Sequence, residues 1–117
     1  MTQITLYHNP RCSKSRQTLA LLEAQHITPE VRLYLEQPPS LKELKEILQK
    51  LDIRPRALLR MAESEYKTLG LDNPALSDTT VIQAMCDTPR LIERPIAITA
   101  TRAIIGRPPE AVLELLS

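Results

Sequence analysis

Residues 3–25 read QITLYHNPRCSKSRQTLALLEAQ, and this stretch decides the fold. Gln3–Tyr7 has β-branched and aromatic members and predicts a short strand, which Asn9-Pro10 ends. Leucines at helical spacing predict a helix over Ser13–Gln25. Val31–Leu35 then predicts a second strand. A strand, a helix and a strand in this order are typical of a parallel pair joined by a right-handed crossover.

The rest of the chain supplies several helices and then a hairpin. Ser40–Glu43 is a capping-box pattern that opens an amphipathic helix. Two apolar, β-branched runs, Pro95–Thr99 and Ala103–Ile105, predict a β-hairpin. A last helix follows Pro108-Pro109, because proline is well placed at a helix start. We therefore expect an α/β fold in which helices flank a mixed four-stranded sheet, with a helical insertion at about residues 40–90.

Composition excludes several classes of function. The 117 residues are 43% apolar, which fits a single domain over residues 1–117 with a real core. Fifteen basic and fourteen acidic residues give a net charge of +1, which argues against nucleic-acid binding through a broad basic face. No apolar run approaches the roughly 20 residues of a membrane span. The N-terminus does not read as a signal peptide, so we expect a cytoplasmic protein. We also expect it to be a monomer.

Two cysteines, Cys12 and Cys86, are too few for a disulfide scaffold. His8 and His26 do not stand at the spacing of a structural zinc site. We therefore expect no bound metal and no bound cofactor. Cys86 shares the apolar face of a predicted helix with Ile82, so we expect a core thiol there.

Cys12 is the candidate nucleophile. It follows a predicted strand and stands at the N-terminus of a predicted helix, where unpaired N–H groups and the helix dipole favour a thiolate. Residues 8–16 include Arg11, Lys14 and Arg16 and no acid. Such surroundings lower the pKa of a cysteine from about 8.5 to roughly 3.5–7.5. The alternative role, a small buried apolar residue, fits these polar and basic flanks poorly.

Three neighbours in the same loop, His8, Asn9 and Ser15, are candidates to support the thiolate. His8 either adds positive charge as an imidazolium or orients the loop. Ser15 stands where a C-x-x-C motif would have its second cysteine, so an outside thiol must clear any adduct on Cys12. The Ser15 hydroxyl either donates to the thiolate or to an oxyanion, or only caps backbone groups.

The segment Tyr7–Arg16 resembles the active-site loop of the glutaredoxin-coupled arsenate reductase family. The resemblance continues in the family's order through almost the whole chain, at Tyr34–Pro39, Arg56–Arg60, Glu93–Ile96 and Gly106–Pro108. It implies a thioredoxin-like fold with a helical insertion, and a cis Pro95 that faces the reactive thiol.

The resemblance also implies roles for individual residues. The catalytic cysteine of the family corresponds to Cys12, and its histidine near the thiol corresponds to His8. Its oxyanion-binding arginines correspond to Arg60, Arg94 and Arg107. From the residues alone, each arginine either binds an oxyanion through forked hydrogen bonds or lies solvated on the surface, and spacing does not bring them together.

The implied reaction is the reduction of arsenate to arsenite. The Cys12 thiolate attacks arsenate, glutathione attacks the adduct as co-substrate, and glutaredoxin reduces the mixed species. The alternative is a thioredoxin-like regulator that docks on a partner such as RNA polymerase and uses Cys12 as a sensor. Regulators of that kind typically carry a C-x-x-C switch, and this chain has Ser15 in its place.

Overall fold

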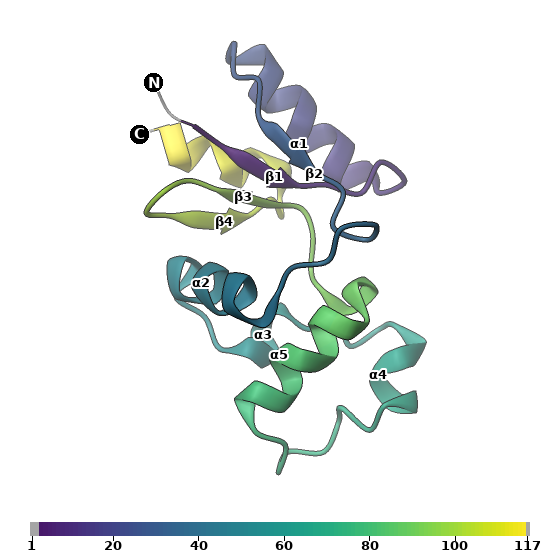
Figure 1. Cartoon of the computed structure of the whole chain (residues 1–117). Coiled ribbons are helices and arrows are strands. Elements are labelled where there is room, and N and C mark those ends of the chain that lie inside the picture. Colours follow the sequence, from purple (N-terminus) through teal and green to yellow (C-terminus); the bar gives the residue numbers. More distant parts are fainter. Residues whose placement is uncertain (1–2, 117) are drawn as a thin grey trace. The chain divides into compact units, whose positions relative to one another are not determined.

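The computed structural model describes residues 3–116, which pack into two compact units (Figure 1). One unit runs to Gln37 and resumes at Arg94, and the other is Pro38–Glu93. The second unit is the helical insertion predicted at about residues 40–90. No helix among residues 3–116 is both long and apolar enough to cross a membrane.

The first unit contains the sheet, which has four strands in the order β2-β1-β3-β4 within the described residues. β1 (Thr5–Tyr7) pairs in parallel with β2 (Glu30–Arg32). β1 also pairs antiparallel with β3 (Ile96–Ile98), which forms a hairpin with β4 (Ala103–Ile105). This mixed sheet confirms the predicted parallel opening and the predicted closing hairpin.

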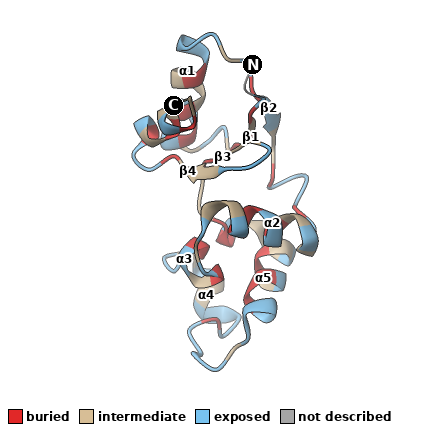
Figure 2. Ribbon diagram, turned by 90° about the vertical axis from the view of Figure 1, so that its left-hand side faces the viewer, coloured by how far each residue is buried: buried red, intermediate tan, exposed pale blue. Residues whose placement is uncertain are grey.

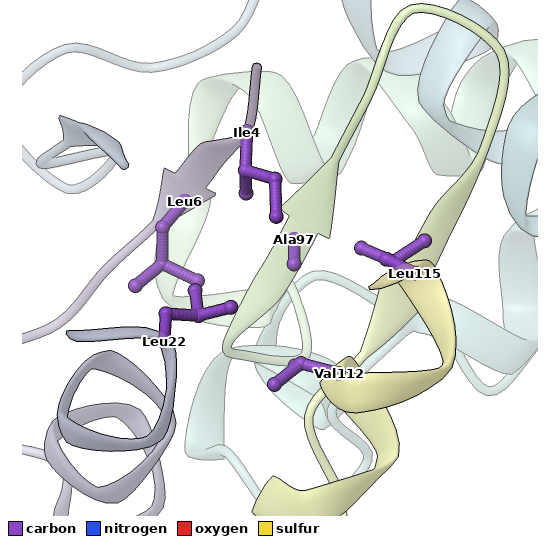
Figure 3. Close-up of a cluster of buried hydrophobic side chains, with 6 residues drawn as sticks. All are labelled: Ile4, Leu6, Leu22, Ala97, Val112 and Leu115. Carbon is purple, nitrogen blue, oxygen red and sulfur yellow. The ribbon is translucent and has the colours of Figure 1, made fainter. Parts of the chain in front are cut away.

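Two helical segments pack on one face of the sheet. α1 (Ser13–Ala24) follows β1, and η2 (Pro109–Leu116) closes the described chain. Their apolar side chains meet those of the strands in one aliphatic cluster, formed by Ile4, Leu6, Leu22, Ala97, Val112 and Leu115 (Figure 3). Burying each large aliphatic side chain of this cluster stabilises the fold by about 1.5–3 kcal/mol. The cluster therefore holds α1, and with it the loop that precedes α1, against the sheet.

The closing segment η2 is a 3-10 helix, where the sequence pattern was interpreted only as a helix. Its buried residues are Pro109, Val112 and Leu115, which are three positions apart. A 3-10 helix has three residues per turn, so this spacing places all three side chains on one face. The tighter helix thus matches the apolar period better than an α-helix would.

The second unit consists of helices: α2 (Leu41–Leu51), α3 (Pro55–Leu58), α4 (Ser64–Thr68), α5 (Asp78–Asp87) and the short η1 (Pro89–Leu91). The predicted capping box opens α2. The Glu43 N–H donates to Ser40 Oγ at 3.1 Å, and the Ser40 N–H donates to the Glu43 carboxylate at 3.0 Å. Along α2 and α5, buried positions recur between exposed ones (Figure 2), as expected for amphipathic helices.

The second strand differs from the prediction. We expected Val31–Leu35, but β2 ends at Arg32. The chain then turns, because the N–H groups of Glu36 and Gln37 both donate to the Leu33 carbonyl at 2.9 Å. This turn places Leu35 and Glu36 beside the loop that follows β1, where both line the same groove.

The two tyrosines near this turn explain why the segment resembles a strand in sequence. Tyr34 is buried, and its ring stacks on that of Tyr7, with centroids 6.0 Å apart and an interplanar angle of 10°. A run rich in apolar and aromatic residues predicts a strand. The same composition also occurs where an aromatic side chain is buried from a turn, as Tyr34 is here.

Candidate active site

The loop between β1 and α1 is held by its own polar groups. The Asn9 side-chain oxygen accepts from the Arg11 N–H, and the Asn9 carbonyl accepts from the Cys12 N–H, both at 3.0 Å. The Arg16 guanidinium donates to the Pro10 carbonyl at 2.8 Å. Asn9 thus shapes the loop by two hydrogen bonds, and sequence analysis had grouped it only as a residue that supports the thiolate. Arg16 fixes the loop as well as adding charge to it.

Cys12 is the N-cap residue of α1, with φ −95° and ψ 122°, so the predicted helix N-terminus is present. Partial burial raises the pKa of its thiol, but the Ser15 N–H, the Arg94 guanidinium and the Lys14 N–H lower it, and the net pKa is lowered. In addition, Arg107 Nη2 lies 3.8 Å from Cys12 Sγ. The direction of the pKa agrees with the prediction, and the helix end contributes as expected. The basic side chain that lowers the pKa is Arg94, however, and not Arg11, Lys14 or Arg16 as the loop sequence had suggested.

His8 and Ser15 form a buried pair on the inner side of the loop. His8 Nδ1 lies 2.6 Å from Ser15 Oγ, which also accepts from the Asn9 N–H at 3.0 Å. Burial lowers the pKa of His8, and the nearby Arg16 lowers it further, so the ring is neutral near pH 7. Of the two roles considered for His8, this arrangement favours orienting the loop over adding charge.

Ser15 supports the thiolate through its backbone and not through its hydroxyl. Its N–H lowers the pKa of Cys12, whereas its Oγ is engaged by His8 and Asn9. Of the two roles that the sequence left open for this hydroxyl, these contacts favour the capping of a backbone group over donation to the thiol. The sequence alone did not decide between donation to an anion and capping of backbone groups, because it does not show which way the side chain of a first-turn serine points.

Arg94 and Arg107 come together at the thiol from the far end of the chain. Arg94 lowers the pKa of Cys12, and its carbonyl accepts from Arg107 Nε at 2.8 Å. Arg94 is joined to Pro95 by a cis peptide bond, as the resemblance implied, and the bond from Arg107 to Pro108 is also cis. Two of the three predicted arginines thus lie at one site with Cys12.

Arg60 belongs to the other unit and is held by carboxylates. Its Nη1 lies 2.9 Å from a Glu93 carboxylate oxygen, and its Nε lies 3.7 Å from one of Glu63. Its N–H donates to the Leu91 carbonyl at 2.7 Å. Glu63 also pairs with Arg90 at 3.3 Å. These two carboxylates compensate the positive charge of Arg60, and no pattern in the sequence had indicated that they would lie beside it.

Gly106 shapes the site by a close approach that sequence reasoning missed. Its N–H donates to the Pro95 carbonyl at 2.9 Å, and a β-carbon there would lie 2.7 Å from Thr18 Oγ1 and 2.8 Å from Pro95 Cγ. Only glycine lets the strand that leads to Arg107 approach α1 and Pro95 this closely. The signal was present in the sequence, because the chain has only two glycines and this one precedes a predicted oxyanion ligand.

Cys86 lies beside the apolar stripe of α5 rather than within it. It is half-buried, whereas Val81, Ile82 and Met85 of the same helix are buried. Burial raises the pKa of the Cys86 thiol, and the nearby carboxylates of Asp87 and Glu43 raise it further. The pKa values of the two cysteines are therefore shifted in opposite directions, and only that of Cys12 is lowered, as a nucleophilic thiol requires. Among residues 3–116, no group of three or more His, Cys, Asp and Glu side chains is arranged to hold a metal ion.

A parallel β1-β2 pair, a hairpin that begins after a cis proline, and an activated thiol at the N-terminus of α1 define a thioredoxin-like protein with a serine in place of the second cysteine. Residues 7–115 match the ArsC family, and the chain belongs to this family. The fold and family that the sequence suggested are thereby confirmed.

Relatives match along nearly the full chain. The Escherichia coli K12 protein YfgD, described as uncharacterized, is 50% identical over 115 residues, which cover 97% of each chain. A Neisseria meningitidis serogroup A protein named arsenate reductase is 46% identical over 117 residues, covering 99% of this chain and 100% of the relative. The solved structure of an arsenate reductase from Vibrio cholerae has a TM-score of 0.94 at 51% identity and covers 97% of each chain.

Proposed function

We propose that this protein reduces arsenate to arsenite with glutathione and glutaredoxin, through a covalent adduct between arsenic and Cys12. The observation that carries the proposal is the Cys12 thiol, whose pKa is lowered while Arg94 and Arg107 lie beside it. Arginine binds tetrahedral oxyanions through forked hydrogen bonds, and a thiolate is the nucleophile needed to attack one. Family membership and the names of the relatives support the same substrate.

The reaction balances with glutathione as the electron source. The thiolate forms a bond to arsenic, and one arsenate oxygen leaves as water after protonation, while arsenic stays pentavalent. The glutathione sulfur then displaces a second arsenate oxygen from arsenic, and this oxygen also leaves as water. A glutaredoxin thiolate attacks the glutathione sulfur and forms a mixed disulfide, which leaves trivalent arsenic on Cys12. Water then releases arsenite from Cys12, and a second glutathione regenerates the glutaredoxin thiol. Over the whole reaction two glutathione thiols become a disulfide, their two electrons reduce arsenic to the trivalent state, and arsenite leaves. These reductants belong to a reducing compartment such as the cytoplasm.

Each residue of the site has a part in this scheme. Arg94 and Arg107 offset the negative charge that accumulates when a dianion meets a thiolate. The Ser15 and Lys14 N–H groups hold the sulfur as an anion until it reacts. His8 and Asn9 keep the loop in shape through the Ser15 hydroxyl. The chain has no second cysteine in the loop, which is why an outside thiol is required.

The test is arsenate turnover by the full-length protein with glutathione and glutaredoxin, followed as oxidation of glutathione. We expect arsenate-dependent turnover in the wild type and in Cys86→Ser, and none in Cys12→Ser. Cys12→Ser removes a partly exposed thiol, so its thermal unfolding should match that of the wild type. Comparable turnover in Cys12→Ser, or no arsenate-dependent turnover in any variant, would overturn the proposal.

A further inference from the structure

A groove of about 330 Å³ lies beside the active-site loop, on the side of β2. One wall is formed by the loop after β1, including Pro10 and Arg11, and the other by the turn after β2, including Leu35 and Glu36. Both walls follow the carboxyl ends of neighbouring parallel strands. Ligands of open α/β sheets bind at that edge, because the chain connections diverge there.

The walls of this groove are fixed in place by backbone hydrogen bonds. The His8 N–H donates to the Arg32 carbonyl at 2.9 Å, which ties the start of one wall to the start of the other. The turn that carries Glu36 is closed by its N–H bond to the Leu33 carbonyl. The Arg32 side chain donates to the Gln37 carbonyl at 2.9 Å and so closes the same turn from outside. The groove is therefore largely preformed, as small-molecule sites usually are.

The lining combines opposite charges with an apolar surface. Arg11 and Glu36 are exposed, and among residues 3–116 neither side chain is engaged in an ion pair. Leu35 is 38% exposed, which is a high value for leucine in this chain, and Leu33 lies beside it in the groove. A matching ligand carries a carboxylate and an ammonium group close together, followed by a chain that packs on the leucines.

We propose that this groove binds glutathione, with the α-carboxylate of its γ-glutamyl end at Arg11 and the α-ammonium at Glu36. The assignment rests on the proposed function, which needs an outside thiol at Cys12. Arg11 directly precedes Cys12, and neighbouring Cα atoms are about 3.8 Å apart, so a molecule held at Arg11 has its thiol within reach of the site. The turn within Tyr34–Pro39, which has no part in the arsenate chemistry, thereby gains a role.

The position of the groove also separates the two reactants. In the sheet order β2-β1-β3-β4, Arg94 and Arg107 come from the segments around β3 and β4, whereas Leu35 and Glu36 follow β2. The loop that carries Cys12 follows β1, between them. The oxyanion and glutathione therefore bind to different parts of the site, and neither has to leave before the other binds. The arsenic bonded to Cys12 is the atom that the glutathione sulfur then attacks.

Binding is tested with S-methylglutathione, which has no free thiol and so reports the groove without arsenate chemistry. We titrate it into the full-length protein and follow backbone amide signals by NMR. Shifts should concentrate in residues 8–11 and 33–37. Acetylating the α-amino group of the ligand should lower its affinity about three- to fivefold, as should Glu36→Gln, because each removes one partner of an exposed ion pair. Together they should cost little more than either alone, since both remove the same interaction.

Glu30→Gln is the matched control, because Glu30 is exposed at the opposite end of β2 and should bind like the wild type. If the wild type binds S-methylglutathione and its N-acetylated derivative equally well, or if Glu36→Gln binds S-methylglutathione as tightly as the wild type does, the assignment is overturned. Shifts confined to other parts of the chain would also overturn it. In turnover, Glu36→Gln should raise KM for glutathione and leave KM for arsenate unchanged. Binding in the groove by a protein that fails to turn over arsenate would support the groove and overturn only the proposed reaction.

Discussion

At Cys12, opposing effects set the ionisation of one sulfur. Partial burial favours the neutral thiol, while two backbone N–H groups of the first helical turn and the Arg94 guanidinium favour the anion. The anion wins, because several donors act on the same atom at a helix N-terminus. Cys86 is also partly buried, but two carboxylates lie near its sulfur in place of hydrogen-bond donors. Burial and these negative charges both raise its pKa. The difference between the cysteines thus lies in what surrounds each sulfur.

This difference predicts the pH dependence of alkylation. A lowered pKa keeps more of Cys12 as thiolate at a given pH than in a free cysteine, so its alkylation rate should reach half its maximum at a lower pH than that of a free thiol. The rate falls as pH drops through that midpoint, because protonation removes the nucleophile. Arg94→Gln should move the midpoint upward. The rate of iodoacetamide modification at Cys12, measured by mass spectrometry across pH, checks both statements.

Arg102→Gln is the control for this experiment, because Arg102 is exposed in the turn between β3 and β4. It removes the same charge from the protein and should leave the midpoint where it is. A midpoint that moves equally in both variants would show that total charge, and not the contact with Arg94, sets the pKa. A wild-type midpoint at or above that of a free thiol would contradict the electrostatic argument itself.

At the scale of elements, much of the fold could be predicted from sequence because local signals were strong. The capping box at Ser40 and the hairpin around residues 96–105 are both present where the sequence patterns predicted them. The predictions failed where tertiary packing decides. Val31–Leu35 ends early as a strand because Tyr34 packs on Tyr7 from a turn. The contacts of the Ser15 hydroxyl likewise depend on the orientation of His8, which no spacing in the sequence encodes.

Gly106 shows how tightly these elements meet, and it supports a prediction on stability. Gly106→Ala places a methyl group 2.7 Å from Thr18 Oγ1 and 2.8 Å from Pro95 Cγ. Both neighbours are buried, so α1 or the start of β3 must shift, at a cost of about 1–3 kcal/mol of unfolding free energy. Because Pro95 adjoins Arg94, turnover should fall as well. Urea denaturation and arsenate kinetics measure the two effects.

Gly70→Ala separates this steric effect from that of backbone conformation. Gly70 has φ +69° and open space around its missing β-carbon. Its alanine variant should lose about 1 kcal/mol from the left-handed backbone alone and keep full activity, since the second glycine ends α4 far along the chain from the loop. If Gly106→Ala is as stable and as active as the wild type, the close approach of the chain after β4 to α1 is needed neither for stability nor for turnover.

At the scale of the whole molecule, the three arginines implied by the family come from both compact units. Arg94 and Arg107 belong to the sheet unit, where they meet Cys12, and Arg60 belongs to the helical unit, where Glu93 and Glu63 hold it. Sequence reasoning treated them as equivalent. The structure distinguishes them by the groups that would lose a partner if each arginine side chain were truncated. Arg107 is exposed, and it contacts the Arg94 carbonyl and the Cys12 sulfur, whereas the Arg60 side chain is 19% exposed and its removal leaves the Glu93 and Glu63 carboxylates nearby.

The arginine variants should therefore divide into two kinds. Arg107→Ala should lower kcat/KM for arsenate roughly ten- to a hundredfold, the equivalent of one charge-assisted hydrogen bond of about 1.5–3 kcal/mol, with little change in unfolding free energy. Arg60→Ala should lower the unfolding free energy by about 1–2 kcal/mol, because Glu93 loses a half-buried partner. Lysine at position 107 should restore charge but not the forked geometry, so rescue should be partial.

The double variant Arg60→Ala with Glu93→Gln decides what Arg60 does. Glutamine removes the carboxylate that Arg60→Ala leaves behind, so the double variant should recover part of the lost stability. If arsenate kinetics recover with it, Arg60 acts only through the ion pair and the oxyanion is held by Arg94 and Arg107. If stability returns while KM for arsenate stays high, Arg60 contributes to oxyanion binding directly. Arsenate kinetics and urea denaturation on the same four proteins, wild type, both single variants and the double, separate these outcomes, because a purely structural residue moves the two readings together.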